Sequence, residues 1–165
     1  MADFASVQLP QAIETTLQGS LKTILGGEWA KATWKQTNEY PHATECPIVS
    51  IVASPGFTVV SETMRGEDED GNPVSGWQQR EYTYEIQVYL RGRKTEDRSE
   101  TARKWLDGIA AILTDDFSLD GLQVDVQVET SMEPETVPIE SGTLSAGAVR
   151  ATVQAWVVQG ETELG

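Results

Sequence analysis

The stretch from residue 82 to residue 130 constrains the fold more than any other part of the sequence. Apolar side chains alternate with polar ones over residues 82–90 and again over residues 122–130, which is the period of a half-buried strand. Between them, residues 95–114 carry one apolar stripe at helical spacing. The stripe consists of Ala102, Trp105, Leu106, Ile109 and Leu113. Since a sheet face and a helix stripe must both bury apolar surface, this unit predicts an α+β fold in which they cover each other.

Further elements are predicted on both sides of this unit. Amphipathic spacing predicts a helix over residues 7–25, and runs of branched or alternating residues predict strands over 48–53, 57–63 and 148–158. The order of elements predicts a single α+β domain over residues 1–165, with a mainly antiparallel sheet of about five strands flanked by two helices. The helix inside the central unit can connect two parallel strands by a crossover, or it can lie across an antiparallel sheet. The sequence is compatible with both arrangements.

Three segments fall outside these elements. Residues 64–76 combine a run of acids with glycine, asparagine and proline, which predicts an exposed acidic loop or the tip of a long hairpin. Residues 131–147 contain two prolines and two glycines and predict an irregular extended arm or loop. Residues 160–165 predict a polar tail outside the core.

Composition excludes several classes of protein. Cys46 is the single cysteine, so no intrachain disulfide can form. No apolar run approaches the roughly 20 residues that cross a bilayer. The first residues lack the basic and apolar regions of a signal peptide, so we expect a protein made in a cytoplasm with no membrane partner. The net charge of −14 argues against general binding to phosphate backbones, which requires lysine and arginine.

Candidate catalytic residues are few. His42 is the only histidine, and the chain lacks the Cys–His spacing of a zinc site, so a loop histidine without chemistry is favoured over a base or a ligand. Cys46 would act as a nucleophile only beside a base, and His42, four residues earlier, is a weak candidate for that base. A small, partly buried thiol is the favoured alternative. We therefore expect no enzymatic activity and no cofactor.

One segment resembles part of a calcium loop. Asp116, Asp120 and Gly121 match its first, fifth and sixth positions, where oxygen ligands and a glycine wrap the ion. The twelfth position is Gln127 instead of a bidentate glutamate, and the loop would run through the predicted strand 122–130. A helix-to-strand turn is therefore favoured over a metal site. An enzyme remains an alternative only if Asp116 and Asp120 bind a metal.

Charge is unevenly distributed along the chain. Six of the twelve basic residues lie within residues 91–104, whereas residues 105–149 contain nine acids and no lysine or arginine. This pattern fits a solvated acidic face beside a basic helix start, or two complementary faces that pair between copies of the chain. In the second interpretation the inter-subunit residues are Arg91, Arg93, Lys94, Arg98, Arg103, Asp107, Asp115, Asp116 and Asp120.

Residues 82–116, YTYEIQVYLRGRKTEDRSETARKWLDGIAAILTDD, together with the late strand AVRATVQAWVVQ, resemble the small neck proteins of tailed bacteriophages. The most similar members are tail terminators, also called tail-completion proteins, and related head–tail joining proteins. The resemblance lies in the pattern and order of elements, because the family has no diagnostic motif. It implies a non-enzymatic structural protein of the virion, in a ring that is usually hexameric. The ring caps the tail tube and joins it to the head connector around a DNA channel.

The resemblance also implies partners and a docking segment. It implies contacts with copies of this chain, with a tail tube protein and with a head connector or stopper protein, after assembly in the host cytoplasm. DNA would pass through the channel without specific binding, since an acidic wall repels phosphates. An extended loop would dock on the tail tube, and residues 64–76 match it, with Arg65, Glu67, Asp68, Glu69 and Asp70. The alternatives are another neck protein (head-completion, stopper or adaptor) and a non-viral α+β module with a closed apolar pocket for a small ligand.

Overall fold

A computed structural model of the chain describes residues 5–25, 31–37, 41–63, 66–74, 76–91, 95–115, 119, 122, 124–139 and 142–158. Its helices are α1 (Ala5–Leu25) and α2 (Thr95–Asp115), with a short 3-10 helix η2 (Ala43–Glu45). Its strands are β1 (Thr33–Lys35), β2 (Ile48–Ala53), β3 (Thr58–Glu62), β4 (Gly66–Glu67), β5 (Pro73–Val74), β6 (Trp77–Leu90), β7 (Asp125–Ile139) and β8 (Gly142–Val158). None of these described helices is long and apolar enough to cross a membrane.

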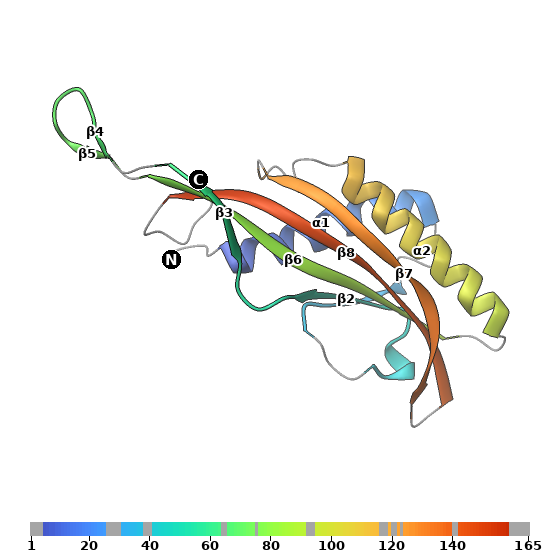
Figure 1. Ribbon diagram of the computed structural model, residues 1–165. Coiled ribbons are helices and arrows are strands. Elements are labelled where there is room, and N and C mark those ends of the chain that lie inside the picture. Colours follow the sequence, from blue (N-terminus) through green and yellow to red (C-terminus); the bar gives the residue numbers. More distant parts are fainter. Residues whose placement is uncertain are drawn as a thin grey trace.

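Six of the described strands form one long, twisted sheet (Figure 1). Its order is β1-β2-β6-β8-β7, and β3 pairs with the first part of β6, beyond the end of β2. Because β8 is antiparallel to both β6 and β7, those two strands run parallel to each other with β8 between them. Helix α2 therefore connects two parallel strands, which decides the alternative that the sequence leaves open.

The α+β class with two α-helices is confirmed for the described residues, and the details of the sheet are corrected. In that part of the chain the sheet has six strands instead of about five, and it is mixed because β1 and β2 are parallel. A separate two-stranded sheet, β4–β5, lies within the predicted loop 64–76. Strand β1 has three residues, which is too short for an alternating pattern to reveal it.

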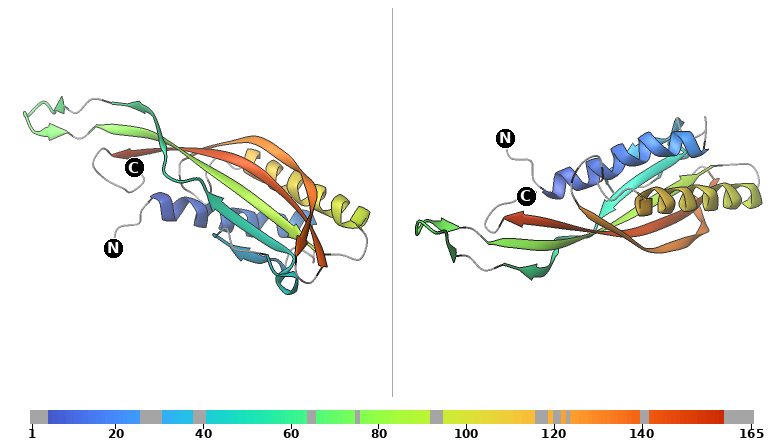
Figure 2. Two further views of the ribbon diagram at one scale, coloured as in Figure 1. Left: turned by 60° about the horizontal axis from the view of Figure 1, so that its bottom comes forward. Right: turned by 90° about the horizontal axis from the view of Figure 1, so that it is seen from above.

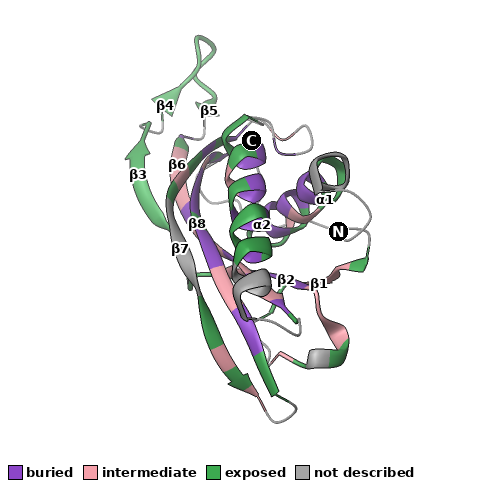
Figure 3. Ribbon diagram, turned by 90° about the vertical axis from the view of Figure 1, so that its right-hand side faces the viewer, coloured by how far each residue is buried: buried purple, intermediate pink, exposed green. Residues whose placement is uncertain are grey.

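The core lies between one face of the sheet and the two helices, which pack side by side on that face (Figure 2). The inward residues of β6 and β8 and the predicted stripe of α2 are all buried, so the alternation and the helical spacing are confirmed (Figure 3). The buried stripe on α2 is Ala102, Trp105, Leu106, Ile109 and Leu113. The opposite face of β6 is polar and only partly buried.

The prediction that residues 131–147 are irregular is corrected for the residues that the structure describes. Residues 131–139 belong to β7 and residues 142–147 to β8, and the two strands pair in a long hairpin. Pro134 and Pro138 lie on β7, which is an edge strand. Proline has no backbone N–H, but on an edge strand a residue whose N–H would face solvent makes no hydrogen bond with it in the sheet, so none is lost. The prolines that favour a loop in the sequence therefore lie on a sheet edge, where proline hinders pairing with another strand.

Candidate assembly and docking surfaces

An arm, defined as residues 57–81, extends beyond the helix-covered part of the sheet (Figure 1). It consists of β3, the β4–β5 hairpin and the first residues of β6. Two hydrogen bonds close its neck, from the Thr63 N–H to the Trp77 carbonyl at 2.8 Å and from the Trp77 N–H to the Thr63 hydroxyl at 2.6 Å. The arm is therefore a structured hairpin, with its tip far from the helices.

The tip of the arm is ordered by one carboxylate. Asp68 Oδ1 accepts hydrogen bonds from the backbone N–H groups of Asp70 at 3.0 Å and Asn72 at 2.8 Å, and Oδ2 accepts one from the Asn72 side chain at 3.3 Å. Gly71 has a φ of +80°, a conformation that disfavours other residues, and its N–H donates to the Asp68 carbonyl. These contacts hold the exposed acids Glu67, Asp68, Glu69 and Asp70 together. Arg65, the remaining predicted docking residue, lies outside the described residues.

The order of the tip is expected to depend on pH through Asp68. Hydrogen bonds, first of all from the Asn72 backbone N–H, lower the pKa of Asp68 below its ordinary value of 3.8. Their stabilisation is therefore fully present above pH 3.8 and is lost as the pH falls through the lower pKa of the folded tip. In an NMR titration, the amide shifts of Asp70 and Asn72 should move together with a midpoint below 3.8. Asp68→Asn should abolish this titration, and unchanged amide shifts down to about pH 2 would contradict it.

Three exposed basic residues follow the opposite end of β6 along the chain. Arg91 comes directly after Leu90, and Arg103 and Lys104 lie near the middle of α2; we call these three residues the basic pole. Lys104 lies 3.4 Å from Glu100 one turn away, but both side chains are about two-thirds exposed, so this pair contributes little. Of the other predicted cations, Arg93 and Lys94 lie outside the described residues, as does the side chain of Arg98 on α2.

The predicted acidic partners of these cations are placed differently. Asp107 and Asp115 are both exposed on α2 itself, and Asp107 follows Arg103 by one helical turn. They therefore lie on the same helix as Arg103 and Lys104. Asp116 and Asp120 lie outside the described residues. The acids of the arm tip, in contrast, lie far from Arg91. In the sequence analysis they are predicted only as residues that dock on a partner.

The acidic tip and the basic pole are held apart by a single strand. β6 has 14 residues and runs from the arm at Trp77 to the basic pole at Leu90. At about 3.3 Å per residue it spans roughly 40 Å, several times the Debye length at physiological salt. The carboxylates of the tip and the Arg91 guanidinium therefore lie too far apart to neutralise each other within one molecule. Figure 1 shows the arm and the far end of β6 at opposite ends of the sheet.

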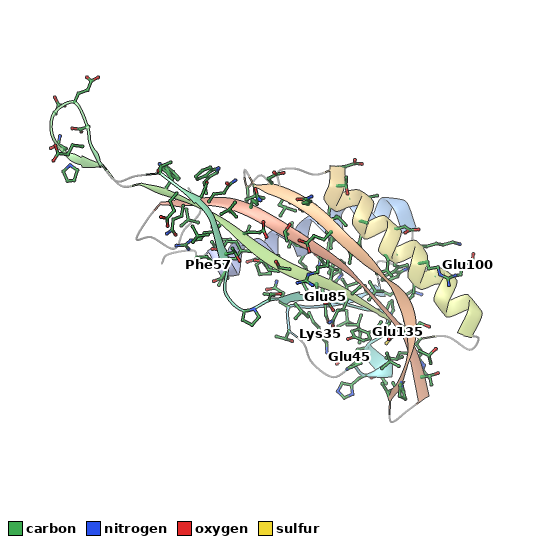
Figure 4. The ribbon with its side chains drawn as sticks, in the orientation of Figure 1. Lys35, Glu45, Phe57, Glu85, Glu100 and Glu135 are labelled. Atoms are coloured by element: carbon green, nitrogen blue, oxygen red, sulfur yellow. The ribbon has the colours of Figure 1, made fainter. Side chains whose placement is uncertain are left out.

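The face of the sheet away from the helices is polar and acidic. On β6 the Tyr89 hydroxyl donates to Gln87 Oε1 and the Gln87 amide donates to Glu85 Oε1, both at 2.9 Å. Glu85 and Glu135, both labelled in Figure 4, line a shallow cavity of about 200 Å³. Burial, and then the charge of Glu85, raise the pKa of Tyr89. Further carboxylates on this face are Glu81, Asp125 and Glu129.

A second cavity, of about 340 Å³, lies where the arm leaves the body. It is lined by Ser6, by the turn at residues 53–57 and by Arg80 and Tyr82 among others. The Arg80 guanidinium lies 4.0 Å from the centre of the Phe57 ring. Both cavities are open and carry charged side chains, so neither is the closed apolar pocket that a small-ligand module requires.

The structure gives Cys46 no catalytic partner in His42. The thiol donates to the backbone carbonyl of His42 at 3.6 Å, not to its imidazole. Burial raises the pKa of Cys46 from 9.0 to about 11, against smaller opposing effects of Arg91 and Lys35. The thiolate needed for nucleophilic attack is therefore scarce at neutral pH.

Alkylation should report this environment directly. With the pKa raised to about 11, the thiolate fraction of Cys46 near neutral pH is roughly 100-fold below that of an ordinary thiol. We expect iodoacetamide to modify the native protein about 100-fold more slowly than the urea-unfolded protein at the same pH. Equal rates in the two states would contradict the assignment of Cys46 as a structural thiol.

The calcium-loop segment lies mostly outside the described residues, including Asp116 and Asp120. Leu119, between them, is fully buried with a φ of +40°, and the Leu122 N–H donates to its carbonyl at 3.2 Å. These contacts belong to a tight turn between α2 and β7. Elsewhere, the described residues contain no group of three or more histidine, cysteine or acidic side chains that could hold a metal ion.

Large apolar side chains are exposed at the root of the arm, which the sequence did not predict. We call these residues the arm base and define them as Phe57, Val59, Val60, Trp77 and Trp156. Their side chains are 46, 41, 48, 39 and 41% exposed, respectively. Phe57 and Val59 lie on the helix side of the sheet, beside Tyr82 and Arg80, whereas Trp77 and Trp156 lie on the opposite face. The prediction of a strand over residues 57–63 is confirmed, but the alternation within that strand does not show that the helices end before covering it. The polar residues directly after Trp77, on the strand that pairs with it, are the one sign in the sequence that this part of the sheet is exposed.

Comparison with known proteins adds no family to these observations. The chain matches no protein-family model, and a search of curated proteins also finds no match.

Proposed function

We propose that this chain is a structural virion protein of a tailed bacteriophage, a tail terminator subunit that forms a ring, usually hexameric. The ring caps the tail tube and joins it to the head connector around a channel for DNA. The observation that carries the proposal is the separation of the acidic arm tip from the basic pole by the full length of β6.

Such a subunit has two different, complementary ends. When two different surfaces of identical copies meet, the contact is heterologous. Repeating such a contact gives a ring if the rotation from one copy to the next returns to the first copy. Opposite charges at the two ends favour this head-to-tail order and disfavour contacts between like ends. The charge distribution of the monomer therefore supports contacts between unlike ends, which a closed ring makes at every interface.

The remaining surfaces support the same function. The acidic open face of the sheet, with Glu81, Glu85 and Glu129, suits a channel wall, because a negative wall repels phosphates and lets DNA slide. The arm extends beyond the helices, as a segment that docks on a tail tube must. Partners in this proposal are copies of the chain, the tail tube protein and the head connector.

Assembly and its charge dependence can be measured together. Light scattering after size exclusion, with negative-stain images, should show a ring at low salt that dissociates as salt rises. Arg91→Glu places an acid at the basic pole and should weaken assembly at least about tenfold. Arg150→Glu is the matched control, since it makes the same charge change at an exposed residue of the open face, where Arg150 bonds Glu129 at 3.4 Å.

Two results would argue against the proposal. One is a protein that stays monomeric at all concentrations and does not bind isolated tail tubes. The other is equal weakening by Arg91→Glu and Arg150→Glu, because assembly would then follow net charge alone and not the basic pole.

A further inference from the structure

We infer that the cavity where the arm leaves the body binds a small organic acid, whose carboxylate is held by Arg80, Tyr82 and Tyr84. The site is open and charged, unlike the closed apolar pocket considered in the sequence analysis. The inference goes beyond the proposed function and does not depend on it, because all of these groups belong to one molecule.

Three separate segments of the chain meet at this cavity. The first turn of α1 contributes Ser6, the turn between β2 and β3 contributes residues 53–57, and β6 contributes Arg80 and residues 82–84. The volume is about 340 Å³. A cavity of about 150 Å³ holds one benzene molecule, so this cavity has room for a ring that carries a carboxylate.

Two buried tyrosines supply polar groups without a partner. Tyr82 and Tyr84 are 5 and 1% exposed, respectively, and both line the cavity. Neither hydroxyl forms a hydrogen bond with another residue of the described part of the chain, and neither is fully enclosed, so each reaches open space. Buried tyrosine hydroxyls usually have a partner, as Tyr89 has in Gln87. Two such hydroxyls beside one cavity therefore point to a ligand.

The hydroxyl of Tyr84 is a proton donor at neutral pH. Burial, and then the neighbouring Tyr82, raise the pKa of Tyr84 well above its ordinary value of 10. The O–H group therefore stays intact over the whole physiological range and can donate a hydrogen bond to an anion.

Arg80 supplies the positive charge of the site. Its guanidinium lies 4.0 Å from the centre of the Phe57 ring, and its Nε donates to Gln78 Oε1 at 3.0 Å. Among the described residues Arg80 has no ion pair and no further hydrogen bond, so both terminal nitrogens lack a protein acceptor. These two nitrogens have the geometry that binds a carboxylate in a bidentate pair.

The converging groups select the charge and the body of the ligand. Arginine can only donate hydrogen bonds, and the tyrosine hydroxyls can donate as well. No carboxylate is among the described residues that line this cavity, whereas Glu85 and Glu135 line the other one. A negatively charged acceptor is therefore favoured. Pro55 and Phe57 form apolar walls, which favour an organic acid over an inorganic anion.

Binding can be tested on the full chain with benzoate as the probe. Calorimetry gives the affinity, and the amide chemical shifts of Ser6 and Thr83 report whether benzoate lies in this cavity. Benzyl alcohol keeps the ring without the charge, and acetate and inorganic phosphate carry charge without the ring. We expect benzoate to bind with a dissociation constant of about 1 mM or below, and each comparison compound to bind at least about tenfold more weakly.

Substitutions identify the groups that hold the carboxylate. Tyr82→Phe with Tyr84→Phe keeps both rings and should weaken benzoate binding at least about tenfold, because two hydrogen bonds to a charged group are lost. Arg80→Gln should weaken binding by a similar factor. Tyr89→Phe is the matched control, since it removes a hydroxyl that bonds Gln87 on the open face and should leave binding unchanged.

Stability without benzoate separates ligand binding from a structural role. The hydroxyls of Tyr82 and Tyr84 have no protein partner, so the double phenylalanine variant should unfold at the same or a higher urea concentration than the wild type. Tyr89→Phe loses a hydrogen bond and should unfold at a slightly lower concentration.

Four results would overturn the inference. The first is no benzoate binding up to about 10 mM. The second is equal binding of benzyl alcohol, which would show that the charge is not recognised. The third is equal binding of acetate or inorganic phosphate, which would show that the apolar walls contribute nothing. The fourth is equal weakening by the double phenylalanine variant and by Tyr89→Phe.

Discussion

Trp105→Ala should lower the free energy of unfolding by about 3–5 kcal/mol, the range for truncating a buried tryptophan. Trp105 is 2% exposed on the inner face of α2, where it packs with Leu106 and Ile109 against the sheet. The loss combines the transfer energy of the indole with the cavity left where the helix and the sheet cannot collapse fully. Urea unfolding followed by circular dichroism measures it, because tryptophan fluorescence is itself altered.

Trp156→Ala is the matched control for this experiment. Trp156 is 41% exposed on the open face, so the same truncation removes less buried area and leaves no enclosed cavity. We expect at most about half the loss seen for Trp105. Equal losses in the two variants would mean that α2 does not form the core contact described above.

Replacing residues 66–74 by a glycine–serine turn should abolish docking to isolated tail tubes under the proposed function. The free energy of unfolding should change by less than about 1 kcal/mol, because the hydrogen bonds described for this hairpin join its own residues to one another. Cosedimentation with tubes and urea unfolding measure the two effects separately. Ring formation should weaken as well if the acidic tip meets the basic pole.

A second variant keeps the length of the tip and removes only its charge. Glu67, Glu69 and Asp70 are changed to glutamine or asparagine, while Asp68 is kept to preserve the turn. Docking that survives both variants would contradict the role of the arm. Docking that survives only the neutral variant would assign the contact to shape and not to charge.

The central α+β unit could be predicted because its pattern follows from burial. β6 from Tyr82 onward, β8 and the stripe on α2 bury one face each, so apolar residues recur at a period of two or of about 3.6. The same logic fails for β1, which has three residues, and for the first part of β6, where exposed or half-buried positions give no alternation. Segment 131–147 was mistaken for a loop because proline is common both in loops and on edge strands.

The functional surfaces were predictable only in part. Arg91, Arg103 and Lys104 are close in sequence, and the structure leaves all three exposed, Arg91 directly after β6 and the other two on α2. Their predicted acidic partner Asp107 follows Arg103 by one turn of the helix that the sequence also predicts, whereas the acids of the arm tip, such as Asp68, precede β6 at its opposite end. The exposure of the arm base depends on where the helices end, and the alternation of side chains in β3 gives no information about that.

The continuity of β6 has a geometric consequence. One unbroken strand runs from the root of the arm at Trp77 to Leu90, next to Arg91, so the direction of the arm relative to Arg91 depends on the twist accumulated along that ladder. The bulge in β3 between Val59 and Ser61 increases the twist locally, at the arm end of the ladder. A substitution that removes the bulge would therefore re-aim the arm without touching any charged residue.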